Sequence, residues 1–144
     1  MMTKDYFENY LALFNDRKYD EFPIYYAEDI EYVMDAASGK IYRGRQAIVD
    51  LYRELHQYFD ESVSIVNFAQ SRTLFAMEAY ALMRAKKPFD MEGFIPIPAG
   101  QVLEMTSFNH YDLNVDGKIS RIRLGIQSMR YIPDDGKLLP RTEA

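Results

Sequence analysis

Two stretches of the chain carry apolar side chains at the spacing of one helix face. In residues 3–15 the stripe consists of Tyr6, Phe7, Tyr10, Leu11 and Phe14. In residues 44–59 it consists of Ala47, Ile48, Leu51, Tyr52, Leu55 and Phe59. This period of three to four residues predicts two amphipathic helices, and a shorter helix is expected between them over residues 19–26.

The period changes to two in the second half of the chain, which is the pattern of strands with one buried face. The segment 86–100 has three prolines and two glycines, and it predicts an ordered loop with apolar anchors. Tight turns are expected at residues 70–72 and at Asp116-Gly117. The pattern predicts a short strand at 29–35, a loop at 36–42, and long strands at 62–69, 73–85, 101–113 and 118–130.

Helices followed by long antiparallel strands are typical of an α+β domain. We expect a cone-shaped, curved mixed or antiparallel sheet that wraps around the three N-terminal helices. Such a cone can leave an apolar pocket between helices and sheet, where a ligand could bind. The 144 residues are expected to form a single domain over 1–130, followed by a C-terminal tail or arm over 131–144.

Composition narrows the classes of function. The chain has no cysteine, which excludes disulfides, thiolate catalysis and cysteine-based zinc sites. A net charge of −5 argues against a nucleic-acid partner, since such domains usually present a basic face. No apolar run reaches membrane-spanning length and the N-terminus does not resemble a signal peptide, so we predict a cytoplasmic protein with no membrane partner. The 12 tyrosines and no tryptophan indicate a core or cavity with hydroxyl groups on apolar walls.

Several polar residues lie inside the apolar segments and are candidates for chemistry. Alternation in the strand at 101–113 puts Asn109 and His110 on opposite faces. Glu78 lies in the middle of another strand, where an inward carboxylate would be a candidate base and an outward one would pair with a surface arginine. His56 lies off the main apolar stripe of its helix and is predicted to be exposed. We find no metal-ligand spacing and no glycine-rich phosphate loop, so no metal and no cofactor are predicted.

Three segments carry a resemblance to the nuclear transport factor 2-like superfamily, which includes SnoaL-like cyclases and ketosteroid isomerases. They are residues 9–32, residues 42–52 with a Gly-x-x-Ala-Ile motif, and residues 93–123 with a proline-rich loop, a strand and Asp-Gly-Lys-Ile. The resemblance implies a cystatin-like α+β barrel whose inner face lines a cavity. It also implies chemistry without a cofactor.

The isomerase branch of the family suggests roles for individual residues. Tyr10 falls at the position of the principal oxyanion donor, and Tyr26 and Tyr52 fall at positions that connect to it by hydrogen bonds. Asn109 stands where the family has a second donor, and an amide can donate there without any change of protonation. Met34 stands at the position of the general base, with Asp35 one residue later, and a bulge would decide which face Asp35 takes.

The resemblance therefore implies a cavity on the face that contains Asn109, with His110 facing solvent or a dimer partner. The expected catalytic residues are Tyr10, Asp35, Glu78 and Asn109. The expected pocket-lining residues are Phe14, Tyr26, Tyr52, Leu55, Phe94, Met105, Tyr111, Leu124 and Ile126. The loop around Phe89 and Phe94 would close the mouth of the pocket.

These features predict a homodimer that binds a small, largely apolar molecule with a carbonyl or hydroxyl group. The predicted activity is that of an isomerase, a dehydratase or a cyclase that moves a proton with a carboxylate. The cyclase branch commonly has an acid in or after its last strand, and residues 119–130 contain no carboxylate. Two alternatives stay open: a ligand-binding or protein-interaction module without catalysis, and an accessory subunit of a larger enzyme, such as a ring-hydroxylating oxygenase.

Overall fold

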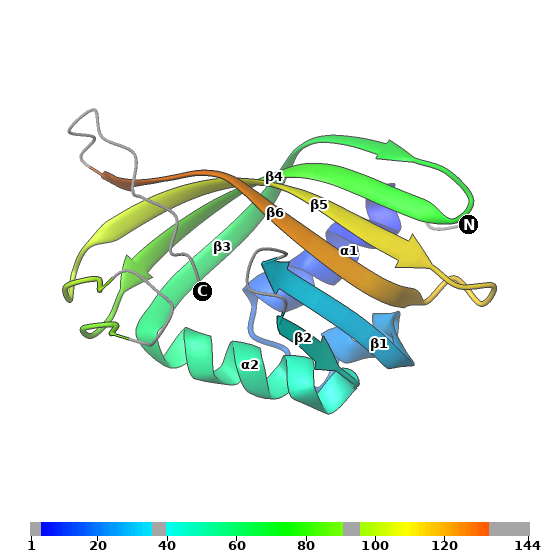
Figure 1. Cartoon of the computed structure of the whole chain (residues 1–144), viewed down its shortest axis with the longest axis horizontal. Coiled ribbons are helices and arrows are strands. Elements are labelled where there is room, and N and C mark those ends of the chain that lie inside the picture. Colours follow the sequence, from blue (N-terminus) through cyan, green and yellow to red (C-terminus); the bar gives the residue numbers. More distant parts are fainter. Residues whose placement is uncertain (1–3, 36–39, 91–95, 133–144) are drawn as a thin grey trace.

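The computed structural model describes residues 4–35, 40–90 and 96–132. Both α-helices are followed by long strands, as the change of period predicts (Figure 1). The elements are α1 (Lys4–Asn15), a 3-10 turn η1 (Phe22–Tyr25), β1 (Tyr26–Asp35), β2 (Lys40–Arg43), α2 (Arg45–Tyr58), β3 (Phe59–Gln70), β4 (Leu74–Ala85), β5 (Val102–Leu113) and β6 (Ile119–Ile132).

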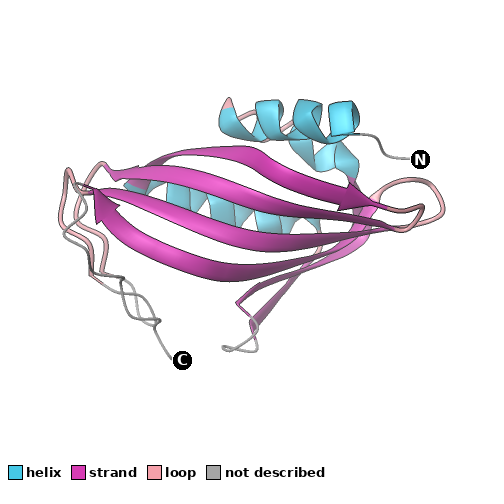
Figure 2. Cartoon of the chain, turned by 90° about the horizontal axis from the view of Figure 1, so that it is seen from above, coloured by secondary structure: helices cyan, strands magenta, loops and turns pink. Residues whose placement is uncertain are grey.

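The strands form one mixed sheet in the order β2-β1-β6-β5-β4-β3. The four long strands β3 to β6 pair antiparallel, and β1 joins them parallel to β6. They bend together beside the two helices (Figure 2), which gives the sheet a concave face. The prediction of an α+β fold with a curved mixed sheet is confirmed. The sheet does not close, because β2 and β3 are edge strands.

Alternation along β5 separates the two faces of the sheet as the sequence predicts. Leu103, Ser107, Asn109, Tyr111 and Leu113 are buried on the concave face. Their neighbours Phe108 and His110 are exposed on the convex face. A period of two therefore fixes which side chains meet the helices.

Several predicted boundaries differ from the structure, and β1 and β3 each begin three residues earlier than predicted. The expected helix over 19–26 is only the four-residue turn Phe22–Tyr25, so the sheet packs against two α-helices instead of three. Pro23 cannot donate a backbone hydrogen bond, and strand β1 already begins at Tyr26. The loop expected over 36–42 contains strand β2, which pairs with β1. Strand β6 continues to Ile132, which lies in the segment expected to be a tail.

The apolar residues form two separate clusters. The smaller cluster contains buried Phe59, Ala85, Phe89, Ile97 and Leu103, with Leu55, Tyr58, Met83 and Tyr131 packed against it. The larger cluster gathers around α1, and aromatic rings pack closely in it, with Phe7 stacked on Phe75 at 4.2 Å between ring centroids. Its buried members are Phe7, Tyr10, Leu11, Phe14, Phe22, Tyr26, Ile30, Tyr32, Ile48, Phe75, Met77, Ala79, Tyr111, Leu113, Ile119 and Ile122.

Side chains that follow α1 cover part of the free edge of β3. The Asn15 amide nitrogen donates to the Val63 carbonyl at 2.9 Å, and its carbonyl oxygen accepts from the Val63 backbone N–H at 2.9 Å. The Arg17 guanidinium donates to the Glu61 carbonyl at 2.7 Å. Two side chains thus take the place of a neighbouring strand along residues 61–63.

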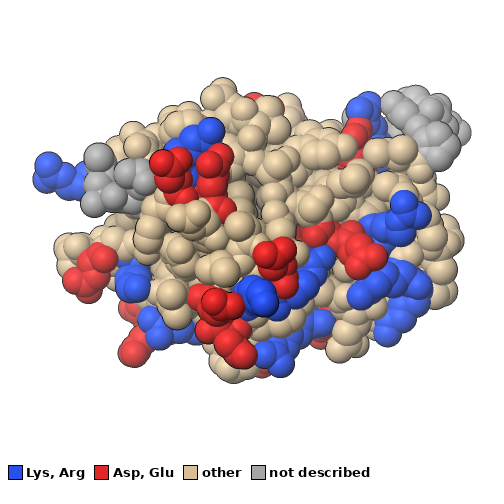
Figure 3. All heavy atoms as spheres, turned by 180° about the vertical axis from the view of Figure 1, so that it is seen from behind, with Lys and Arg blue, Asp and Glu red and all other residues tan. Residues whose placement is uncertain are grey.

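Charged groups of both signs share the molecular surface. Figure 3 shows acidic side chains interspersed with basic ones on one face. On the convex face, Arg123 pairs with Asp112 at 3.2 Å, and Arg130 forms an ion pair with Glu104. In the described ranges, no helix has the length and apolar character needed to cross a membrane.

Candidate functional site

Four polar side chains lie on three elements that run from one apolar cluster to the other, and we call them the polar belt. Strand β5 contributes Ser107 and Asn109, α2 contributes His56, and β3 contributes Glu61. Among the described residues, His56, Ser107 and Asn109 are the buried polar side chains. Small side chains adjoin the belt on β4, since Ala79 pairs with Ser107. Polar groups so far from water need partners, which makes the belt the candidate site.

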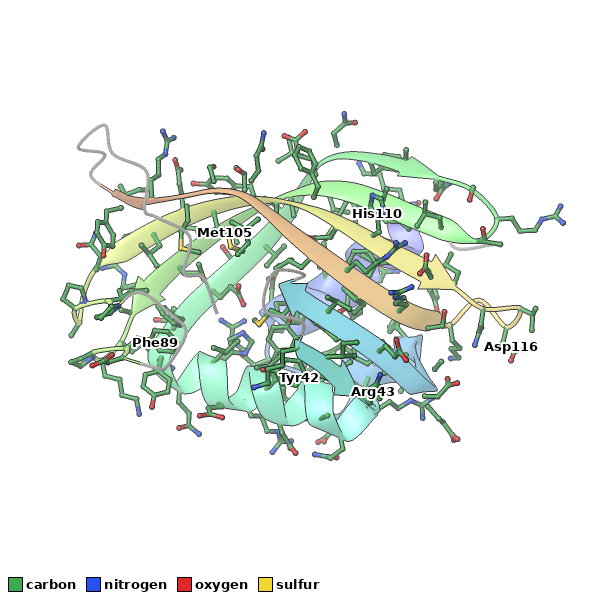
Figure 4. All side chains as sticks on the ribbon, in the orientation of Figure 1. Tyr42, Arg43, Phe89, Met105, His110 and Asp116 are labelled. Atoms are coloured by element: carbon green, nitrogen blue, oxygen red, sulfur yellow. The ribbon has the colours of Figure 1, made fainter. Side chains whose placement is uncertain are left out.

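Asn109 is the residue of the belt with an unmet hydrogen bond. Its side chain is 3% exposed, and its Oδ1 atom has no partner in the described structure. Its amide forms a hydrogen bond with the Tyr111 hydroxyl. Burial raises the pKa of Tyr111, and this hydrogen bond lowers it by a smaller amount. Figure 4 shows Asn109's neighbour His110 and, on the same strand, Met105. Asn109 is buried and His110 is exposed, as the alternation predicts.

Tyrosine pairs flank the belt. The Tyr10 and Tyr26 hydroxyls lie 2.6 Å apart, and the Tyr32 and Tyr52 hydroxyls lie 2.5 Å apart. Burial raises the pKa of all four, so the phenols stay protonated and remain hydrogen-bond donors. Sequence analysis expected Tyr26 and Tyr52 in one network with Tyr10, but the structure gives two pairs and adds Tyr32.

His56 is not exposed, contrary to prediction, and it joins two further side chains. Its Nδ1 lies 2.7 Å from the Tyr19 hydroxyl, and its Nε2 lies 3.1 Å from Oε1 of Glu61. The His56 side chain is 4% exposed and that of Glu61 is 14% exposed. Neither Tyr19 nor Glu61 was predicted, although Glu61 shares one face of β3 with the apolar residues Phe59 and Val63.

The predicted pocket-lining residues divide into two groups. Phe14, Tyr26 and Tyr111 are buried in the larger cluster. The others among the described residues retain partial exposure: Tyr52, Leu55, Met105, Leu124 and Ile126. Phe94 lies outside the described residues. These partly exposed side chains leave apolar surface accessible on the concave face, and a ligand could bury that surface.

The two predicted carboxylates have different surroundings. Glu78 lies on β4 between Met77 and Ala79, which are buried on the concave face, so Glu78 is on the convex face, away from the belt. The pairing of β1 with β2 shifts register between Val33 and Asp35, which is the bulge that sequence analysis considered at this point. The Asp35 side chain lies outside the described residues.

Side chains in the described part of the chain line hollows on the outer surface. One of about 240 Å³ is lined by Arg17, Asp60, Glu61, Ser62, Leu82, Arg84 and Val102. The other, of about 270 Å³, lies between α1 and β3 and is lined by Glu8, Leu11, Ala12, Asn15, Val63, Ser64 and Ile65. Within the described ranges, no three His, Asp or Glu residues come together as a metal site requires.

Comparisons with known proteins agree with the fold. A family model described as a SnoaL-like domain matches residues 7–122. A candidate polyketide cyclase of Pseudomonas putida has a similar structure, with 20% identity, a TM-score of 0.72, and coverage of 86% of this chain and 91% of that chain. The comparison with curated proteins gave no match.

Two further similar structures differ in what they do. One is the epoxide hydrolase/cyclase-like enzyme SalBIII, which has a role in pyran ring formation in the polyether salinomycin (15% identity, TM-score 0.67, 91% of this chain and 92% of that chain). The other is a computationally designed 17-OHP binder (13% identity, TM-score 0.67, 86% of this chain and 93% of that chain). At these identities the similarity shows a shared fold, and function has to be argued from the site.

Proposed function

Since the chain belongs to the SnoaL-like domain family, we propose that its concave face binds a small, largely apolar molecule with a hydroxyl or carbonyl group and moves a proton on it. The reaction would be an isomerisation, a dehydration or a cyclisation without a cofactor. The partly exposed apolar residues Leu55, Met105, Leu124 and Ile126 would contact the body of the ligand.

The unpartnered Oδ1 of Asn109 carries the proposal. A buried polar atom without a hydrogen bond costs about 1–3 kcal/mol, so the ligand-free site is unfavourable at this position. Because an amide oxygen can only accept, the group that satisfies it must be a donor. A ligand hydroxyl, or the enol form of a ketone, has that donor.

The tyrosine pairs provide donors for a ligand oxygen. Each pair uses one of its two O–H groups in the hydrogen bond between its members, which leaves the other hydrogen free to donate. Tyr10 or Tyr26 in one pair and Tyr32 or Tyr52 in the other could therefore stabilise negative charge on a bound oxygen. Donors that are already in place cost little reorganisation when charge develops.

The remaining predictions belong to the same proposal. Asp35 is retained as a candidate proton acceptor, and Glu78 is not, because of its place on the convex face. A homodimer would use the convex face, where Phe108 is 47% exposed and Leu82 is 39% exposed. The main alternative is a binding module without catalysis. Met34 at the position of the general base favours it, and a designed 17-OHP binder has the same fold.

Thermal melting with a matched pair of probes tests ligand binding. 2-Naphthol has a hydroxyl donor, and 2-methoxynaphthalene has the same ring system without it. At about 100 times its dissociation constant, 2-naphthol should add roughly 2.7 kcal/mol of stability, a shift on the order of 5–10 °C in the melting temperature. The preference for 2-naphthol should vanish in Asn109→Leu and persist in His110→Ala. Equal shifts with both probes, or none, would refute the proposal.

A further inference from the structure

Tyr19, His56 and Glu61 form a continuous hydrogen-bonded chain across three elements. Tyr19 precedes η1, His56 lies in the last turn of α2, and Glu61 lies near the start of β3. The Tyr19 hydroxyl lies 2.7 Å from Nδ1 of His56, and Nε2 of His56 lies 3.1 Å from the Glu61 carboxylate. Two side chains far apart in sequence thus hold opposite ends of one imidazole ring.

The chemistry of the partners fixes the direction of both hydrogen bonds. An ionised carboxylate can only accept, so Nε2 of His56 donates its hydrogen to Glu61. In a neutral imidazole the other nitrogen is then an acceptor, so the Tyr19 hydroxyl donates to Nδ1. Glu61 therefore sets the tautomer, and the Tyr19 hydroxyl holds the ring by donating to Nδ1.

Packing holds the imidazole in place. The Tyr52 ring stacks on His56 with centroids 5.6 Å apart, and the Phe14 ring meets it edge-on at 5.5 Å. Tyr52 is also a member of the second tyrosine pair, through its bond to Tyr32. His56 is thus part of the wall that carries the proposed oxyanion donors.

The Glu61 carboxylate faces the same interior as the buried phenols. Burial is the main cause of the raised pKa of Tyr32, Tyr52 and Tyr111, and the negative charge of Glu61 adds to each rise. The Arg17 guanidinium donates to the Glu61 backbone carbonyl, so a positive group lies beside it. Glu61 is also partly accessible, with a side chain that is 14% exposed.

From this arrangement we propose that Glu61 is the proton acceptor of the site, that His56 positions it by donating from Nε2, and that Tyr19 holds the histidine ring by donating to Nδ1. The inference rests on the proposed function, because it supplies the base for the same ligand. It moves the base from the end of β1 to the start of β3.

The proposed step balances without a co-reactant. Glu61 takes a proton from the carbon next to a ligand carbonyl, so that this C–H bond breaks and a carboxyl O–H bond forms. The electron pair of the C–H bond becomes a C=C bond, and the carbonyl oxygen becomes an enolate oxygen. The tyrosine hydroxyls stabilise that oxygen, and Glu61 then returns a proton to carbon. In deuterium oxide the carboxyl proton of Glu61, whose side chain is 14% exposed, is replaced by a deuteron from solvent before this return.

Hydrogen–deuterium exchange of 2-tetralone in deuterium oxide tests this step by nuclear magnetic resonance. 2-Tetralone is a small apolar ketone whose carbonyl oxygen would accept from the tyrosine hydroxyls and whose neighbouring carbon has the C–H bonds that Glu61 would break. The natural protein should speed exchange at the carbon beside the carbonyl, and Glu61→Gln should lower that rate by about 100-fold or more. Glutamine keeps a side-chain oxygen that can still accept the hydrogen bond from Nε2 of His56, but it cannot take up a proton. Asp60→Asn changes an exposed neighbour and should leave the rate unchanged.

The 2-naphthol melting shift separates failure of the base from failure of the site. A shift retained in Glu61→Gln together with lost exchange supports the inference. If Glu61→Gln keeps both the 2-naphthol melting shift and the rate of 2-tetralone exchange, the inference is overturned, because another group must then accept the proton. Binding of 2-naphthol without exchange by the natural protein also overturns it, while the binding site stands. If 2-naphthol does not bind, the proposed function fails and the inference fails with it.

Tyr19→Phe tests the positioning role. Long-range proton–nitrogen spectra report which ring nitrogen carries the hydrogen, and the chain has only two histidines. His56 should carry its hydrogen on Nε2 in the natural protein, and in Tyr19→Phe the Nδ1 signal should shift because this nitrogen loses its hydrogen-bond donor. His110 serves as the internal control. Exchange should slow while the 2-naphthol shift stays, and a hydrogen on Nδ1 of His56 in the natural protein would overturn the assignment.

Discussion

Raising the pH should unfold this protein because of its buried phenols. Burial is the largest cause of the raised pKa of Tyr10, Tyr26, Tyr32, Tyr52 and Tyr111. Below pH about 10 these tyrosines are protonated in both the folded and the unfolded chain, so their contribution to stability is complete. Above that pH the unfolded chain loses protons that the folded chain keeps, and the free energy of unfolding falls.

The magnitude follows from the number of such tyrosines. At pH 11 a tyrosine that ionises normally in the unfolded chain and not in the folded one lowers stability by about 1.4 kcal/mol. Five of them together lower it by about 7 kcal/mol, which is comparable with the whole stability of a typical domain, about 5–15 kcal/mol. Unfolding is therefore expected close to pH 11.

Tyrosinate absorbance and circular dichroism, followed together during an alkaline titration, check this expectation. Exposed tyrosines should ionise gradually, and the buried ones should ionise in one cooperative step together with the loss of secondary structure. Replacing Tyr10 and Tyr26 together by phenylalanine should move that step to higher pH. The reasoning is refuted if all 12 tyrosines ionise before the circular dichroism signal changes.

Three further predictions concern stability. Asn109→Leu removes the unpartnered oxygen, so it should raise the free energy of unfolding by about 1–2 kcal/mol in urea titrations while it removes the preference for 2-naphthol; a loss of stability would contradict this. Tyr10→Phe and Tyr26→Phe should each cost about 1–2 kcal/mol and the double variant less than their sum, whereas additivity would exclude a shared hydrogen bond. Asn15→Ala should cost about 1–3 kcal/mol and promote self-association in light scattering, because it exposes the backbone of Val63; a monodisperse, equally stable variant would contradict this.

The sequence predicts best where a simple period governs burial. The alternation in β5 correctly puts Asn109 and His110 on opposite faces, and the family resemblance correctly identifies the face of Asn109 as the inner one. The helix α2 is likewise evident from its apolar stripe. Strand β2 has only four residues, mostly exposed, so its pairing with β1 leaves no such signal.

The candidate site is less predictable, since it depends on contacts between distant segments. His56 lies off the apolar stripe of its helix and is nevertheless buried, because Tyr19 and Glu61 satisfy both of its ring nitrogens. Glu61 lies on the same face as Phe59 and Val63, but nothing in the local sequence of either partner indicates a bond to His56. Family resemblance directs attention to Asp35 instead, and the hydrogen bonds that single out Glu61 exist only in the folded chain.

The separation of the two apolar clusters has a consequence for cooperativity. Between Leu103 and Tyr111 the concave side of β5 presents Ser107 and Asn109, so the hydrophobic core is interrupted along this strand. The smaller cluster can therefore loosen while the larger one stays intact, and its amide hydrogens should exchange first. An apolar ligand bound across the belt would contact both apolar clusters and make the hydrophobic core continuous. Occupancy would then make the protein unfold as a single unit.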